Sequence, residues 1–146
     1  MTEVLFHFNA PDRLIYACRL LRKAVRSGTG VAVSAPAPTL VRLDRALWTF
    51  DAQEFLPHLL LRAGESPPPR LQRTPIWLVE RAEQAVHQPV LVHLGDEPAE
   101  GFESFTRLIE IVSTDAAERE AARRRWKHYA ARGYAIERHE VSAAAP

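Results

Sequence analysis

The sequence contains few of the residues that build disulfide-bonded or zinc-stabilised folds. Cys18 is the only cysteine among 146 residues, so no internal disulfide can form and no second thiol can complete a cysteine-based zinc site. No run approaches the roughly 20 apolar residues of a bilayer span, and the first ten residues do not read as a signal peptide. We therefore expect a cytoplasmic protein, with Cys18 as an inert core thiol.

The glycine pattern of a nucleotide-binding loop is also missing. The only Gly-x-Gly, Gly28 to Gly30, stands between an expected helix and the next strand, and no Walker loop occurs. A dinucleotide loop needs the reverse context, so that backbone amides and the helix dipole face the phosphates. None of the six histidines has another four residues away, the spacing of a helical metal site. We therefore expect no cofactor, no metal and no catalytic residue.

The order of elements indicates the fold. With 47% hydrophobic and 25% charged residues, the chain can bury a core, and we expect one domain over residues 1–141 with a disordered tail at 142–146. Strands are predicted at Glu3–Phe8, Val31–Ser34, Ile76–Val79, Val90–Leu94 and Leu108–Val112. Helices are predicted after the cap Asp12, from the cap Thr39 to about Trp48, and over some 18 residues from a cap at Ser113, Thr114 or Asp115 to Gly133. Thr49 to Thr74, with its prolines, is expected to be a long loop with a short helical piece. The pattern predicts a three-layer, Rossmann-like α/β domain with a mostly parallel sheet of about five strands.

Charge is segregated along the chain although the net charge is only +1. Residues 79–120 hold ten acidic and three basic side chains, a balance of −7, whereas residues 121–146 have a balance of +4. Such a sequence can present two surfaces of opposite potential, which attract different partners.

The last predicted helix combines cations with aromatic residues. On a helical wheel, Ala122, Trp126, Tyr129 and Ala130 share an arc that can face the sheet. A strip formed by Arg119, Arg123 and Lys127 lies beside that arc, and Arg124, Arg125 and Arg132 lie further round. The helix is either a solvated basic face or one wall of an anion-binding groove, in which Trp126 and Val112 supply the apolar pocket.

Large aromatic residues also gather in an irregular stretch, LDRALWTFDAQEFLPH at 43–58. Trp48, Phe50, Phe55 and Leu56 form either a small core under a loop or a protein-binding patch. The physics of the residues leaves both interpretations open.

Two rival functions, an enzyme and a direct DNA binder, remain open beside peptide binding. Asp96, Glu97 and Glu100 come just after the strand ending at Leu94, at the edge where α/β proteins bind ligands. They form either a solvated loop or the site of a small nucleotide- or phosphoester-processing enzyme. Direct binding of single-stranded DNA by the basic helix is a third hypothesis, but it needs exposed aromatic side chains, and Trp126 and Tyr129 lie on the core-facing arc.

Three blocks, in this order and spacing, resemble the chi subunits of bacterial DNA polymerase III. They are LDRALWTFDAQEFLPH at 43–58, VLVHLGDEP at 90–98 and FTRLIEIVSTDAAEREAARRRWKHYAARGY at 105–134. The patterns LDxxLW followed by FxPH, and RxxWKxY before a glycine, are specific because an α/β domain has no general need for them.

The resemblance implies an accessory protein without an active site of its own. It implies attachment to the clamp loader through the psi subunit, and binding of the C-terminal tail of single-stranded-DNA-binding protein, which gives an indirect association with DNA. That tail is acidic and ends in a hydrophobic residue that bears the free carboxylate. By resemblance, the tail-binding residues are Val112, Arg119, Arg123, Trp126 and Lys127. Trp48 and Phe55 would face psi, and Ala130 stands where this family can have a basic residue.

Overall fold

A parallel sheet of seven strands forms the centre of the computed structural model, which describes residues 1–142. The strands are β1 (Glu3–Ala10), β2 (Val31–Ser34), β3 (His58–Leu61), β4 (Ile76–Val79), β5 (Val90–His93), β6 (Arg107–Ser113) and β7 (Ile136–Glu140). Their order across the sheet is β3-β4-β2-β5-β6-β1-β7, and every pairing is parallel. The predicted α/β class is confirmed, with seven strands in place of about five.

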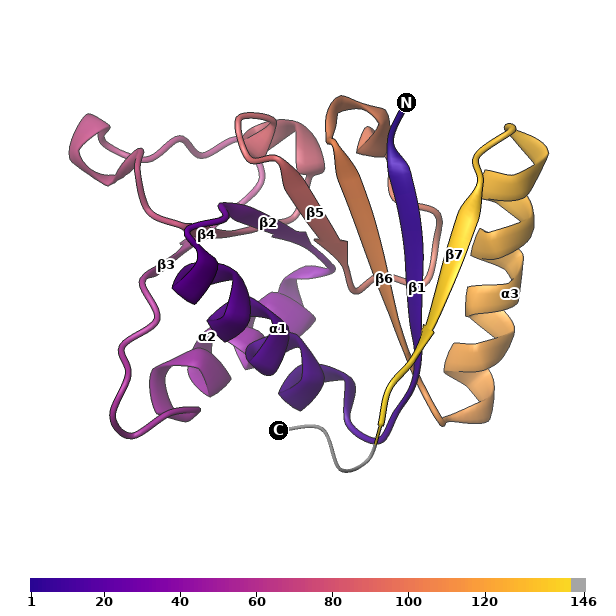
Figure 1. Ribbon diagram of the computed structural model, residues 1–146. Helices are drawn as coiled ribbons and strands as arrows, with labels where there is room; N and C mark the ends of the chain where they lie inside the picture. The colour runs from indigo at the N-terminus through magenta and orange to yellow at the C-terminus, as the bar shows by residue number, and fades with distance from the viewer. Residues whose placement is uncertain (143–146) are drawn as a thin grey trace.

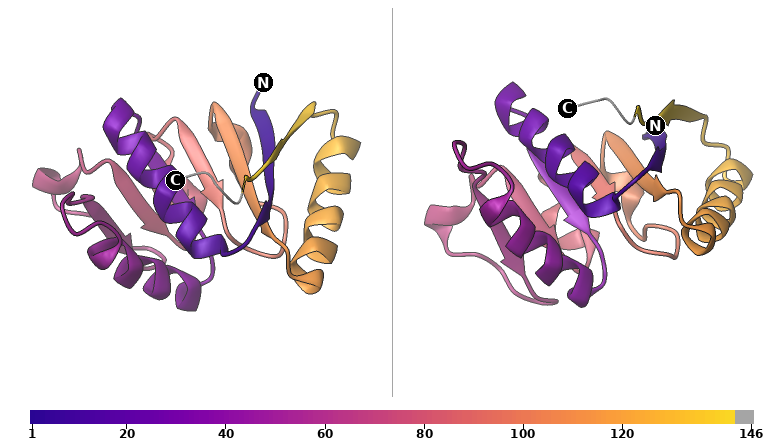
Figure 2. Two further views of the ribbon diagram at one scale, coloured as in Figure 1. Left: turned by 60° about the horizontal axis from the view of Figure 1, so that its bottom comes forward. Right: turned by 90° about the horizontal axis from the view of Figure 1, so that it is seen from below.

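Helices cover both faces of the sheet (Figures 1 and 2). The helices α1 (Arg13–Ser27) and α2 (Ala37–Thr49) pack on one face, where Leu21 and Leu43 belong to the same buried cluster as Ile111. The helix α3 (Ala116–Ala131) packs on the other face, where Tyr129 is buried with Phe6. None of the helices in residues 1–142 is long and apolar enough to cross a bilayer.

Local sequence explains where the helices begin and end. Asp12 caps α1 by accepting a hydrogen bond from the Ile15 backbone N–H at 3.0 Å, and Gly28 ends the helix at φ 76°. Asp115 caps α3 in the same way, because its side chain accepts a hydrogen bond from the Glu118 backbone N–H at 3.0 Å. The predicted cap Thr39 is wrong, because α2 already begins at Ala37 after Pro36, and a proline in the first turn suits a helix start.

Two strands form where none was predicted. The strand β3 lies inside the stretch expected to be a loop, which also contains a 3-10 turn at Pro69–Leu71. The strand β7 follows Gly133, and its side chains are mostly exposed. Both are edge strands, so partners distant in sequence, β4 and β1, determine them more than their own patterns do. Of the predicted disordered tail, residues 143–146 lie outside the described residues.

Candidate functional site

A groove of about 440 Å³ runs beside α3 on its face of the sheet. Its lining residues are Phe6, Phe8, Asn9, Val112, Arg119, Ala122, Arg123, Trp126, Lys127 and Arg138. The structure therefore brings together, in one depression, all five residues predicted to bind the acidic tail.

The floor of the groove is apolar. Phe6 and Phe8 come from β1, and Val112 comes from the end of β6. The half-buried Trp126 ring packs against Phe6, with ring centroids 5.1 Å apart and planes tilted by 53°. Such a floor accommodates a hydrophobic side chain.

Cations form the rim of the groove. Arg119, Arg123 and Lys127 are exposed and follow one another at intervals of four along α3, which aligns them on one side of the helix. Arg123 makes an exposed ion pair with Glu120 at 3.4 Å, one turn away. Exposed pairs of this kind contribute about 0.2–1 kcal/mol, so an anionic ligand can displace the glutamate.

Arg138 of β7 is a groove residue that the sequence analysis missed. Its guanidinium carbon lies 5.1 Å from the centre of the Phe8 ring, and the strand register places Arg138 beside Phe6. Stacking holds the guanidinium over the apolar floor. Within residues 1–142, the lining thus carries four cations and no carboxylate. Only the pairing of β7 with β1 shows that Arg138 lines the groove, because Arg138 belongs to a polar segment without a strand-like pattern.

Two expectations about α3 are corrected. Arg125, predicted to lie on the basic face, is only 1% exposed, because it pairs with a buried glutamate on β6. Ala130, predicted to lie on the sheet-facing arc, is exposed. Trp126 and Tyr129 do lie on that arc, and the full burial of Tyr129 removes one of the two aromatics that direct single-stranded DNA binding would need.

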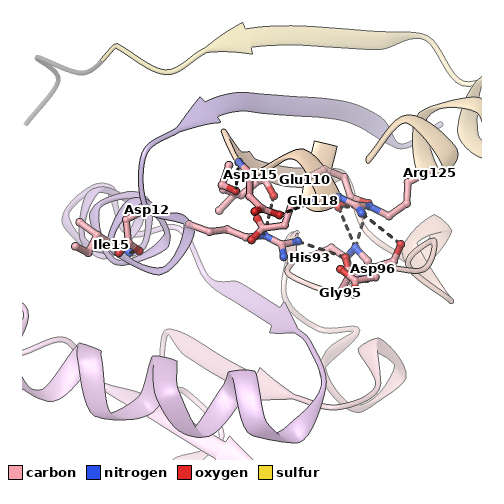
Figure 3. Close-up of polar contacts among 12 residues, drawn as sticks. Asp12, Ile15, His93, Gly95, Asp96, Glu110, Asp115, Glu118 and Arg125 are labelled. Atoms are coloured by element: carbon pink, nitrogen blue, oxygen red, sulfur yellow. Dashed lines mark hydrogen bonds and ion pairs between the residues drawn. The ribbon is translucent and has the colours of Figure 1, made fainter. Parts of the chain in front are cut away.

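The partner of Arg125 is Glu110, whose side chain is fully buried (Figure 3). Arg125 Nε donates to Glu110 Oε1 at 3.1 Å, and Tyr129 Oη donates to Oε2 at 2.6 Å. The Nδ1 atom of His93 also contacts the carboxylate, 2.9 Å from Oε1. Burial alone would raise the pKa of Glu110, but His93 and Arg125 outweigh it and lower the pKa below its ordinary value. The network fixes the rotation of α3 about its own axis, which directs the cationic strip toward the groove.

Trp48 and Phe55 form an aromatic patch near β3, at the opposite end of the sheet from α3. Their side chains are 59% and 64% exposed, and their ring centroids lie 5.5 Å apart. In the same stretch, Leu56 is buried and Phe50 is half-buried, so the segment is part core and part exposed surface. Large exposed aromatics in contact with each other are typical of protein-binding surfaces.

The His58 ring packs against the aromatic patch. Its ring lies 4.9 Å from the Trp48 ring. Its Nδ1 is 2.7 Å from the Leu56 carbonyl oxygen, and its Nε2 is 3.0 Å from Asp44 Oδ1. These contacts link the end of the FxPH pattern to α2, which also carries the exposed Trp48.

The acidic loop after Leu94 borders a separate crevice of about 690 Å³ at the carboxyl ends of β2 and β5. Asp96, Glu97 and Glu100 all line it, as do Glu80 and Glu83, whereas Arg81 is the one arginine among its described lining residues. This balance of charge disfavours a nucleotide or phosphoester, because the carboxylates repel phosphate.

Comparisons with known proteins agree on one family. The family model described as "DNA polymerase III chi subunit, HolC" matches residues 1–137. The chain is 31% identical to the DNA polymerase III subunit chi of Pseudomonas aeruginosa, over 97% of this chain and 98% of that protein. It is 30% identical to the subunit chi of Haemophilus influenzae over 86% and 85% of the two chains, and 29% identical to that of Escherichia coli over 86% and 82%.

Among solved structures, the C-terminal domain of S. cerevisiae Dbp5 is similar in fold, with a TM-score of 0.61. The two chains are 10% identical, and the match covers 96% of this chain and 90% of that one. At this identity the likeness concerns the α/β architecture alone. The family match and the three relatives show more: this chain belongs to the chi subunits of DNA polymerase III, accessory proteins of DNA replication.

Proposed function

We propose that this chi subunit is a tether without catalytic activity, which works in the cytoplasm and holds the clamp loader to DNA covered by single-stranded-DNA-binding protein. The groove beside α3 binds the acidic C-terminal tail of that protein, and the Trp48–Phe55 patch binds the psi subunit. Tethering raises the effective concentration of the polymerase machinery at the covered DNA, so no chemical step is required.

The chemistry of the groove carries this proposal. An acidic peptide that ends in a hydrophobic residue needs an apolar pocket for its last side chain and cations for its carboxylates. Phe6, Phe8 and Val112 provide the first, and the α3 strip provides the second. Arg138 adds a cation from β7, so that carboxylates can be bound from two elements.

The positions of the two surfaces support simultaneous binding. The aromatic patch is next to β3, and the groove lies at the β1 and β7 end of the seven-stranded sheet. Six strand spacings of about 4.8 Å separate the two edges by nearly 30 Å. Two partners can therefore occupy the molecule together without competing for the same residues.

The first experiment tests the groove by calorimetry with a synthetic aspartate-rich peptide ending in a hydrophobic residue. We expect a dissociation constant in the micromolar range, about −8 kcal/mol. Arg123→Ala should weaken binding at least about tenfold, because a charge-assisted hydrogen bond contributes roughly 1.5–3 kcal/mol. Arg124→Ala is the matched control: this exposed neighbour does not line the groove and should change affinity less than twofold.

Two further conditions distinguish the groove from general attraction to cations. Amidation of the peptide C-terminus should weaken binding, since the free carboxylate is lost, and added salt should weaken it by screening. Equal affinities for wild type, Arg123→Ala and Arg124→Ala would remove the α3 strip from the site.

The second experiment tests the aromatic patch with purified psi. Trp48→Ala should reduce psi affinity by about 30-fold or more, as expected for a central aromatic anchor, and Phe55→Ala should also reduce it. Ile15→Ala, at an exposed apolar residue of α1, is the control and should leave psi binding unchanged. All three variants should keep tail-peptide affinity, and an unchanged psi affinity in Trp48→Ala would place the psi interface elsewhere.

A further inference from the structure

One cation of the groove comes from the edge of the sheet rather than from α3. Arg138 lies on β7, and strand alternation places it on the same face as Ile136, which packs on the α3 side of the core. Figure 1 shows β7 at the edge of the sheet, close to α3. The groove is therefore lined by cations from two elements, the helix and the edge strand.

The Arg138 guanidinium lies against the apolar floor. Its carbon is 5.1 Å from the centre of the Phe8 ring, although the strand register pairs Arg138 with Phe6 and Phe8 with Glu140. The side chain thus reaches along β1 from the level of Phe6 to the Phe8 ring. Stacking on an aromatic ring restricts the guanidinium before any ligand arrives, so less freedom is lost on binding.

The N–H donors of Arg138 have no partner within residues 1–142, because no acceptor hydrogen-bonds to this side chain and no carboxylate pairs with it. Glu140 is the acid on the same face of β7, but its Oε2 accepts a hydrogen bond from Asn9 Nδ2 at 2.8 Å. On α3, by contrast, Arg123 already pairs with Glu120. Arg138 can therefore take up a carboxylate without giving up an internal contact.

The end of a peptide chain places special demands on such a groove. A terminal hydrophobic residue carries its side chain and the free carboxylate on the same carbon atom. When that side chain enters the floor formed by Phe6, Phe8 and Val112, the carboxylate must lie close to the floor as well. Of the four lining cations in the described residues, Arg138 alone stacks on a ring of the floor.

We infer that Arg138 binds the terminal carboxylate of the tail, while the α3 strip attracts the acidic side chains that precede it. The assignment rests on the proposed function of the groove and adds the residue that determines its specificity. The planar guanidinium can donate two parallel N–H bonds to one carboxylate, a geometry that an ammonium group does not reproduce. The groove thereby distinguishes a free chain end from an acidic segment inside a protein.

Calorimetry on the full chain tests this assignment with the aspartate-rich peptide in two forms, one with a free C-terminus and one amidated. Amidation should weaken binding to wild type about tenfold. Arg138→Gln should bind the free acid about tenfold more weakly than wild type does, and amidation should then change the affinity less than twofold. The two changes are not additive, because both remove the same contact.

Three variants serve as controls. Arg123→Ala should weaken the binding of both peptides but keep the tenfold effect of amidation. Arg124→Gln changes an exposed arginine outside the lining and should alter neither affinity by more than twofold. Arg138→Lys retains the charge but lacks the planar fork, so amidation should weaken its binding only about threefold.

NMR of the arginine Nε–H groups provides a direct readout. The Arg138 signal should shift with the free acid, and at least fivefold less with the amide at equal saturation. The urea midpoint of Arg138→Gln should equal that of wild type, because the side chain is exposed.

Equal losses for the two peptides in Arg138→Gln, or a tenfold amidation effect that persists in this variant, would overturn the assignment and leave the proposed function of the groove intact. Failure of wild type to bind either peptide would instead refute that function, and the assignment with it.

Discussion

Replacement of Arg125 tests whether the buried network stabilises α3 on the sheet. In Arg125→Met, the apolar stem remains, but Glu110 loses the guanidinium that donates to it at 3.1 Å. Both side chains are at most 1% exposed, so water cannot take over the lost interaction. Breaking a buried pair by removing one partner costs about 3–5 kcal/mol, because the remaining charge stays buried with fewer partners, here Tyr129 and His93 alone.

Urea unfolding followed by tryptophan fluorescence measures this effect. With a slope of about 2 kcal/mol per molar urea, the midpoint should fall by about 1.5–2.5 M at pH 7. Arg124→Met changes the exposed neighbouring residue and should stay within about 0.5 kcal/mol of wild type.

The pH dependence provides a second criterion for the same variant. A carboxyl group with a lowered folded pKa contributes stability above its unfolded pKa, and this contribution is lost as the pH falls through the folded value. The difference in the free energy of unfolding between wild type and Arg125→Met should therefore become smaller in acid. A midpoint equal to that of Arg124→Met, or a gap independent of pH, would refute the assignment of Glu110 and Arg125 as a stabilising pair.

Two further predictions concern buried titratable groups. Burial, followed by the charges of His139, Arg107 and Lys23, lowers the pKa of His7 from 6.5 to about 4. Because the unfolded state takes up this proton first, the contribution of His7 to the free energy of unfolding is fully present above pH 6.5. This contribution falls by about 3 kcal/mol on acidification to about pH 4. In urea unfolding, His7→Gln should not show this decrease with pH. Burial, with a smaller contribution from Asp12, raises the pKa of the Cys18 thiol to about 11. A thiol reagent at pH 8 should therefore label Cys18 only as urea unfolds the chain, and rapid labelling of the native protein would contradict its burial.

Much of the fold could be predicted from local patterns. The strands Val31–Ser34 and Ile76–Val79 lie where their apolar runs indicated, because central strands of a parallel sheet are covered on both faces. Asp12, Asp115 and Gly28 act as helix ends through contacts within a few residues. The strands β3 and β7 could not be predicted in this way, since each pairs on one side only, and the side chains of β7 are mostly exposed.

The candidate groove shows the same division between local and distant determinants. The spacing of Arg119, Arg123 and Lys127 determines that they share one side of α3, because helical periodicity is a local property. The contribution of Arg138 depends on the pairing of β7 with β1, which brings together residues more than 130 positions apart. Sequence spacing also gave no sign that Arg125 is buried.

Local sequence patterns were therefore enough to predict the α/β class, most element boundaries, the cationic strip and the family. The charges that remain available to a partner could be identified only from the folded chain. Arg124 and Arg125 are adjacent in the chain, yet one is exposed and the other is bound to Glu110. The physical reason is that a buried ion pair requires a partner at about 3 Å, and a strand distant in the sequence supplies that partner only when the sheet assembles.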